Sequence, residues 1–165
     1  MKIRYLPAIA LFLGASATLL SHPHLNKMVK ATLPNKVEAS VTYYTVPANM
    51  EHVKKVQVGD FVPTRAVLSL SGGTASGSTM IQAGDYTIGA IRNAGDWTLA
   101  LYPGKPARGM APDKSKVISL DSSFSDSEGT AHHVSFDLAP GHGKLEGKTT
   151  LIWHFGNLYL AGALQ

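Results

Sequence analysis

The chain has 165 residues, no cysteine, and 15 basic against 11 acidic side chains, which gives a formal net charge of +4. The lysines are scattered rather than gathered into a basic run, so we expect no nucleic-acid partner. The absence of cysteine excludes disulfides, thiol catalysis, iron–sulfur sites and lipid attachment to a processed N-terminal cysteine.

Residues 1–21 have the pattern of a secretory signal peptide. A short basic head precedes an apolar run over residues 6–20, which is too short for a stable membrane span, and small residues follow it. Cleavage after Ala17 satisfies the small-x-small rule, whereas cleavage after Ser21 exposes His22, and both positions stay open. We therefore expect a bacterial export signal, a secreted or periplasmic protein, and no membrane span once the signal is removed.

Residues 22–165 predict a single all-β domain after the signal peptide. Apolar and polar residues alternate with a period of two, and turn-forming Gly, Pro, Asn and Asp separate the segments. About eight to ten short strands at this spacing indicate an antiparallel β-sandwich of immunoglobulin-like or jelly-roll-like type. The expected strands cover residues 29–33, 37–44, 66–71, 78–82, 86–92, 97–102, 116–120, 132–138, 149–155 and 158–161.

Three segments are expected to lack strands. Asn49 follows Pro47 and is placed to cap a short helix that continues to Lys55. Residues 71–78 and 121–129 are rich in Ser, Gly and Asp, and we expect them to be loops.

The segment Ile81-Gln-Ala-Gly-Asp-Tyr-Thr-Ile-Gly-Ala-Ile, followed by Asp96-Trp-Thr-Leu-Ala-Leu-Tyr, forms an expected hairpin. This hairpin resembles the core of an exported bacterial family known as domain of unknown function 2911 (DUF2911). The chain lacks the Gly-Arg and Trp-Arg-x-Gly-Ala-Asn segments that accompany the family's middle region, so the resemblance is to a divergent member. The resemblance implies a secreted β-sandwich, and it implies no activity because the family has none assigned.

Histidine is the residue type that most clearly suggests a chemical function, because imidazole is the commonest metal ligand. If export leaves His22 at the N-terminus, its α-amino nitrogen and ring Nδ1 can chelate copper, and a second histidine completes the site. Pro23 has no N–H, which argues against a copper site built from deprotonated backbone amides. The alternative is that these histidines are ordinary surface or hydrogen-bonded residues. The candidate metal ligands are His22, His24, His132, His142 and His154.

Strand alternation gives two of these histidines an expected side. His132 shares a face with Val134 and Phe136, which places it on the apolar side of its strand, and His154 points away from Trp153. Adjacent histidines on one strand point to opposite faces, so His132 and its neighbour do not easily ligate one ion.

Three functions stay open. We favour a non-catalytic binding or structural module of the cell envelope, with an envelope protein or a carbohydrate as partner. The second is a copper-binding periplasmic protein that uses the N-terminal histidine. The third is a hydrolase with a site assembled from loops, although the serine at position 76 lacks the Gly-x-Ser-x-Gly spacing of a nucleophile elbow. The sequence indicates no other cofactor, and it leaves the oligomeric state unknown.

Overall fold

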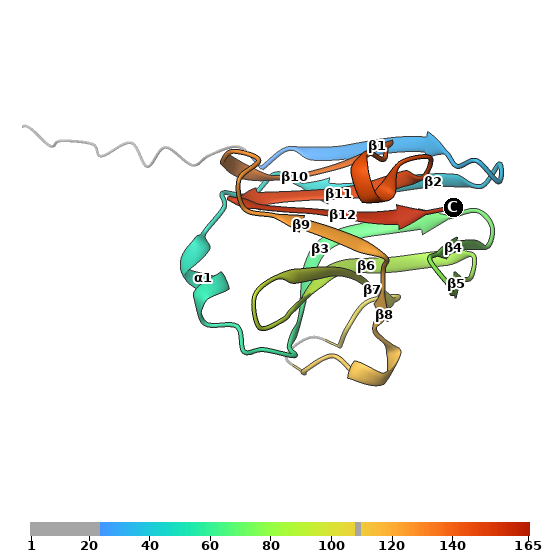
Figure 1. Cartoon of the computed structure of the whole chain (residues 1–165). Coiled ribbons are helices and arrows are strands. Elements are labelled where there is room, and N and C mark those ends of the chain that lie inside the picture. Colours follow the sequence, from blue (N-terminus) through green and yellow to red (C-terminus); the bar gives the residue numbers. More distant parts are fainter. Residues whose placement is uncertain (1–23, 108–109) are drawn as a thin grey trace, which may run out of the picture.

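The computed structural model describes residues 24–107 and 110–165, so the expected signal peptide and His22 lie outside the described residues. The described part folds as two antiparallel sheets packed face to face, together with one small hairpin (Figure 1). This confirms the expected all-β sandwich. The larger sheet contains six strands in the order β1 (Asn26–Thr32), β2 (Glu38–Tyr44), β3 (Phe61–Leu70), β6 (Gly84–Arg92), β7 (Trp97–Pro103) and β8 (Ile118–Ser119).

The smaller sheet has a Greek-key arrangement. Three strands connected by hairpins lie side by side, and the strand that precedes them in the chain pairs with the last of the three. The order is β10 (Ala131–Pro140), β11 (Thr149–Gly156), β12 (Leu158–Leu164) and β9 (Ser122–Ser125). The hairpin of β4 (Thr74–Ser76) and β5 (Thr79–Ile81) forms a separate two-stranded sheet, which Ala75 joins to the residue after β12 by two backbone hydrogen bonds with Gln165.

Period-two alternation decides which side chains fill the space between the sheets. On β2, Ala39, Val41 and Tyr43 are buried, whereas the residues between them are less buried. The expected hairpin is confirmed, because β6 pairs with β7 from Arg92 opposite Trp97 onward. Two segments expected as loops instead contain strands, since β4 and β9 pair with β5 and β12.

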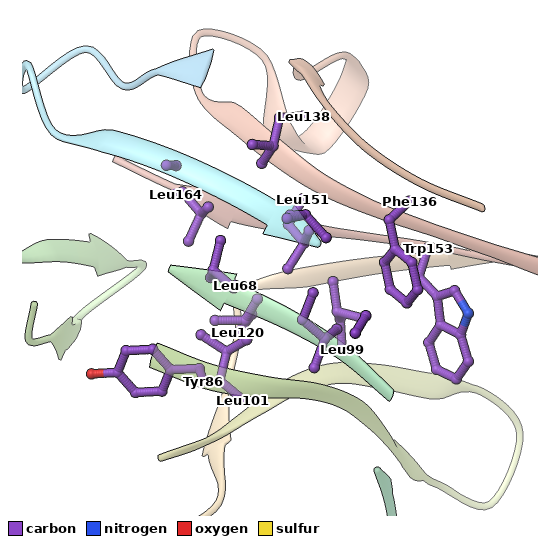
Figure 2. Packing of buried hydrophobic residues seen from close by; sticks show 14 of the residues in the cluster. Leu68, Tyr86, Leu99, Leu101, Leu120, Phe136, Leu138, Leu151, Trp153 and Leu164 are labelled. Atoms are coloured by element: carbon purple, nitrogen blue, oxygen red, sulfur yellow. The ribbon is translucent and has the colours of Figure 1, made fainter. Parts of the chain in front are cut away.

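The core is a continuous row of apolar side chains between the sheets (Figure 2). Leu68, Leu99, Leu101 and Leu151 are completely buried, and burying one leucine side chain contributes about 1.5–3 kcal/mol. Phe136 and Trp153 lie at one end of this row in Figure 2. The leucine-rich part of the core therefore gives way to an aromatic part at that end.

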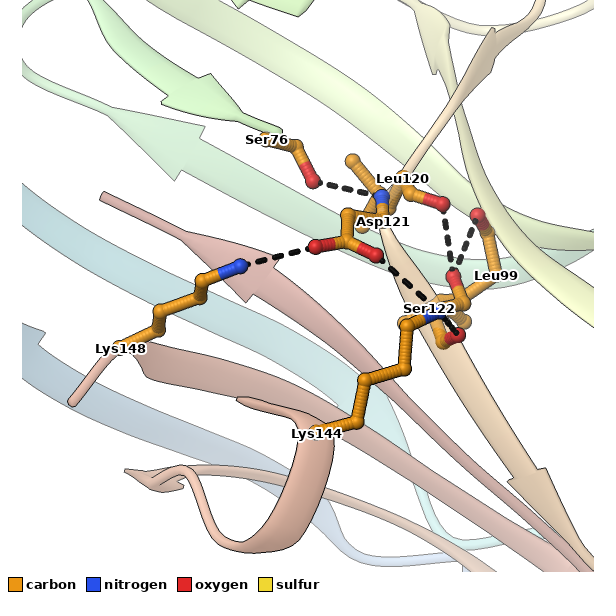
Figure 3. A network of polar contacts seen from close by, with 7 residues as sticks. All are labelled: Ser76, Leu99, Leu120, Asp121, Ser122, Lys144 and Lys148. Atoms are coloured by element: carbon orange, nitrogen blue, oxygen red, sulfur yellow. Dashed lines mark hydrogen bonds and ion pairs between the residues drawn. The ribbon is translucent and has the colours of Figure 1, made fainter. Parts of the chain in front are cut away.

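A polar network fixes the corner where the chain passes from β8 in one sheet to β9 in the other (Figure 3). The Asp121 carboxylate lies 2.8 Å from Lys148 Nζ and 3.3 Å from Lys144 Nζ. The Asp121 backbone N–H donates to Ser76 Oγ at 2.9 Å. The hydrogen bond from Lys148, aided by Lys144, holds the pKa of the Asp121 carboxyl below its usual value, although partial burial opposes this.

Helical structure is limited to short segments. Helix α1 (Met50–Lys54) lies across one end of the sandwich, between β2 and β3 (Figure 1). The side-chain oxygen of Asn49 accepts from the Glu51 backbone N–H at 3.0 Å, which confirms the expected N-cap. Two 3₁₀ turns, η1 (Lys114–Lys116) and η2 (Gly143–Leu145), complete the described elements. None of the helices in the described ranges is long and apolar enough to cross a membrane.

Candidate ligand-binding cavity

A cavity of about 530 Å³ lies at the α1 end of the sandwich. Its walls come from inner-face side chains of both sheets and from α1 with the segment that follows it. This volume lies within the range of about 300–1,000 Å³ that is typical of small-molecule sites. At about 30 Å³ of liquid per water molecule, the cavity has the volume of roughly eighteen waters, which is enough for a ligand of about ten to fifteen non-hydrogen atoms. The wall is mainly apolar and includes Tyr43, Trp97, Phe136, Trp153 and Phe155.

Register across β10 and β11 builds one aromatic wall of the cavity. Phe136 lies directly opposite Trp153, and their rings are stacked with centroids 5.9 Å apart. Phe155, two residues further along β11, has its ring 6.1 Å from that of Trp153. The Tyr43 ring meets the edge of Phe136 at 5.2 Å from the opposite sheet. Such contacts hold large rings in fixed positions, so this part of the wall is rigid.

The indole of Trp153 carries a hydrogen-bond donor that has no partner in the described part of the chain. The residue is only 7 % exposed, and its Nε1 meets no acceptor among the described residues. Figure 2 shows this nitrogen on the edge of the indole that faces away from Phe136 and the core leucines. A buried donor without a partner costs about 1–3 kcal/mol, and a buried tryptophan usually finds an acceptor. This N–H is therefore enclosed by neighbouring side chains and is not reached by solvent.

An irregularity in β3 shapes the opposite side of the cavity mouth. The pairing of β3 with β6 shifts register between Pro63 and Val67. Thr64 Oγ1 donates to the Ile88 backbone oxygen at 2.7 Å and accepts from the Ala66 N–H at 3.0 Å, which stabilises the irregular backbone. Bulges of this kind re-aim side chains and occur frequently beside functional sites.

Arg65 lies within this irregular stretch and lines the cavity mouth. Its side chain is exposed, and it forms no ion pair or hydrogen bond with any other described residue. The mouth thus carries a cation that no described residue neutralises.

Two histidines join Arg65 at the mouth. His24 and His52 both line the cavity, and both are exposed. The His24 ring Nδ1 lies 3.0 Å from the Thr45 backbone oxygen, and it must donate this hydrogen bond because a carbonyl oxygen only accepts. No aspartate or glutamate occurs among the described residues that line the cavity. The mouth therefore has basic groups without acidic counterparts.

The segment that closes the end of the cavity is fastened to the larger sheet. Arg92 Nη1 donates to the backbone oxygen of Val56 at 2.5 Å and approaches those of Val53 and Lys54 at 3.4 Å. The Arg92 guanidinium carbon also lies 6.0 Å from the centre of the Trp97 ring. One arginine thus joins the α1 segment to the β6–β7 hairpin, on the rim of the cavity.

The structure separates the candidate metal ligands. His132 is exposed, although alternation along its strand gives it the same face as the buried Val134 and Phe136. The reason is a register shift between Ala131 and Ser135, which interrupts the alternation that β10 follows from Val134 onward. His142 precedes η2, beyond the other end of β10, so it is roughly 30 Å of strand away from His132.

His154 lies on the outer face of the smaller sheet. Its ring meets the edge of Tyr159 at a centroid distance of 5.6 Å, and its Nε2 is buried without a partner among the described residues. Burial raises the pKa of the Tyr159 hydroxyl, and the nearby Glu128 and Asp137 carboxylates add to this effect. Of the candidate ligands that the structure describes, His24 lines the cavity and His132, His142 and His154 do not.

The described residues contain no group of three or more His, Asp or Glu side chains placed to hold one metal ion. His22, the central ligand of the copper hypothesis, lies outside the described residues. Copper binding through an N-terminal histidine therefore stays a prediction.

Sequence reasoning missed the cavity and the role of Arg65. One signal was available, because Pro63 lies inside a run of strand-forming residues, and proline within a strand marks an edge or a bulge. An arginine two residues after such a proline marks this stretch as a candidate site. The burial of the Trp153 indole N–H without a partner depends on the packing of both sheets, which the sequence pattern does not show.

Comparison with known protein families, with curated protein sequences and with solved structures finds no match to this chain. The resemblance to DUF2911 therefore stays a prediction that rests on the β6–β7 hairpin.

Proposed function

We propose that this protein is an exported, non-catalytic binding protein of the cell envelope that holds a small apolar ligand between its two sheets. The observation that carries this proposal is the aromatic cavity of about 530 Å³ at the α1 end. A large apolar cavity with a few polar groups at one side is the common form of a ligand site.

The chemistry of the wall favours an apolar ligand over a carbohydrate. A sugar carries a hydroxyl on nearly every carbon, and each one buried without a hydrogen bond costs free energy. The deep wall offers mainly aromatic and aliphatic groups, whereas the charged and imidazole side chains lie at the mouth. A chain or ring with one or two acceptor atoms meets these requirements.

The protein contains its own reporter for this binding. It has two tryptophans in total, Trp97 and Trp153, and both line the cavity. A ligand that enters displaces water from around these indoles, so their fluorescence should change when the cavity is filled.

The test is a titration of the purified full chain with decan-1-ol, a neutral amphiphile of suitable size, followed by calorimetry and tryptophan fluorescence. We expect saturable binding of one molecule per chain with a negative heat-capacity change, the sign of apolar burial. Val56→Phe places a larger side chain at the half-buried cavity wall and should weaken binding at least fivefold. Val58→Phe is the matched control, because Val58 is 64 % exposed and lies outside the cavity wall.

Two outcomes would contradict the proposal. One is the absence of saturable decan-1-ol binding to a folded chain. The other is equal affinity in the two phenylalanine variants, which would place the binding site away from the cavity.

Export is tested separately by the mass of the chain recovered from the cells that produce it. We expect a chain that begins at residue 18 or at residue 22, in agreement with cleavage after Ala17 or Ser21. A chain that retains residues 1–17 would contradict export through this signal.

A further inference from the structure

From the cavity mouth we infer that the ligand is an anionic amphiphile, with its carboxylate or similar acidic group at Arg65 and its apolar chain in the aromatic cavity. This inference rests on the proposed function, and it adds the charge and the orientation of the ligand. It depends on three observations of the described residues, which concern the charge of the mouth, the backbone that presents it, and the polarity gradient along the cavity.

The first observation is the imbalance of charge. Arg65, His24 and His52 line the cavity, and no acidic residue does so among the described lining residues. Five described lysines form ion pairs, among them Lys54 with Glu51, Lys114 with Asp60 and Lys148 with Asp121. Arg65 has no such partner. A guanidinium presents a planar fork of donors that matches a carboxylate in two parallel hydrogen bonds.

The second observation is that hydrogen bonds hold the irregular backbone around Arg65 in place. Thr64 uses its hydroxyl both to donate to Ile88 and to accept from Ala66, so it holds the register shift in place from both sides. In a regular strand, the alternation that buries Ala66 and Leu68 would place Arg65 on the outer face of the sheet. The bulge therefore presents Arg65 at the mouth while β3 continues into the sandwich.

The third observation is the order of groups along the cavity. Arg65, His24 and His52 are exposed at the mouth, whereas Phe136 and Trp153 are buried at the inner wall. An amphiphile whose acidic group stays at the mouth keeps that group partly in water, so it avoids the cost of burying a charge. The reverse orientation would place the charge against aromatic rings. The geometry thus selects both the charge of the head and the direction of insertion.

The experiment compares decanoate with decan-1-ol, which share the chain and differ in the charge of the head. Both are titrated into the full chain at about 0.15 M salt, where screening limits long-range effects to roughly 8 Å. We expect decanoate to bind about tenfold more tightly than decan-1-ol. Arg65→Gln should weaken decanoate binding about tenfold and leave decan-1-ol binding within twofold of its original value.

Lys55→Gln is the matched control for the loss of one positive charge. Lys55 is exposed at the end of α1, close to the mouth, but it does not line the cavity. Decanoate affinity should change less than twofold in this variant. An equal loss in Lys55→Gln and Arg65→Gln would mean that net charge, and not the Arg65 fork, attracts the anion, and it would overturn the inference.

The remaining outcomes separate this inference from the proposed function. If decan-1-ol binds and decanoate binds no more tightly, the inference of an anionic head group is contradicted, while the proposed apolar ligand cavity is supported. If Arg65→Gln weakens both ligands equally, Arg65 shapes the cavity without recognising charge, and the inference again fails. If neither ligand binds, the proposed function itself is contradicted.

Discussion

Arg92 on β6 donates from Nη1 to the backbone oxygen of Val56, 2.5 Å away, and so connects the larger sheet to the segment that closes the cavity. The two residues are 36 positions apart in the chain, and Val56 lines the cavity. The same guanidinium lies over Trp97, another lining residue. The stability of the α1 segment is therefore coupled to the wall of the cavity.

Arg92→Lys should loosen this segment. A lysine keeps the charge but loses the planar fork that reaches the backbone oxygens of Val53, Lys54 and Val56. Hydrogen bonds from a charged group contribute about 1.5–3 kcal/mol, so backbone amides of residues 50–56 should exchange hydrogen at least tenfold faster. Hydrogen–deuterium exchange with mass spectrometry measures this effect. Arg65→Lys should leave the exchange of residues 50–56 unchanged, and similar rates in both variants would contradict the role of Arg92.

The ion pair between Asp121 and Lys148 should make the free energy of unfolding depend on pH. The folded-state pKa of the carboxyl is lowered from the ordinary value of 3.8, chiefly by the Lys148 hydrogen bond. The pair therefore stabilises the fold fully above about pH 4, and this contribution is lost as the pH falls through the lower, folded-state pKa. Asp121→Asn should reduce the free energy of unfolding by about 1 kcal/mol at pH 7, and the difference should shrink in acid.

Urea denaturation of the chain and of Asp121→Asn between pH 7 and pH 3 measures this difference. Lys148→Gln should produce a loss close to that of Asp121→Asn, because Lys148 is only 24 % exposed in the pair. Lys144→Gln should cost less, since its side chain is 65 % exposed. A difference that stays constant down to the acid limit of folding would show that ionisation of Asp121 is not its cause.

The two layers of this fold could be predicted from the sequence because apolar and polar residues alternate within each strand. Val41, Leu99 and Leu101 are buried as their positions within their strands indicate. Strand β9 could not be found in this way, because Ser122–Ser125 has no apolar alternation and forms a strand only by pairing with β12. Its existence depends on a partner strand, which local pattern does not encode.

The cavity is harder to predict from the sequence than the strands are. It arises where inward side chains of six strands meet near α1, and the space between them depends on the register of every pair. Arg65 lies where the pairing of β3 with β6 shifts register, and His132 lies in a similar irregular stretch of β10. Such irregularities interrupt the ladder locally and depend on the partner strand, so the sequence pattern of one strand does not show them.

Gly162 on β12 should not tolerate a side chain. A Cβ at this position would lie 2.6 Å from Leu120 Cδ1 and 3.0 Å from Leu99 Cδ2, inside the packed core. Gly162→Ala should therefore reduce the free energy of unfolding by about 1–3 kcal/mol through overpacking. Gly95→Ala is the control, because no atom lies within 4 Å of its Cβ position. Thermal and urea denaturation compare the two, and equal stability would contradict this packing.

The raised pKa of the Tyr159 hydroxyl should reduce the stability of the fold at high pH. Burial raises the pKa of its hydroxyl above the ordinary value of 10.0, and the Glu128 and Asp137 carboxylates raise it further. Above pH 10 the unfolded chain loses this proton while the folded chain keeps it, so the unfolded state binds fewer protons and stability falls as the pH rises. Tyr159→Phe removes the titrating group, so its stability should decline less steeply between pH 10 and pH 11 than that of the unchanged chain. Urea denaturation across this range measures both slopes, and parallel slopes would show that Tyr159 ionises as readily in the folded protein as in the unfolded one.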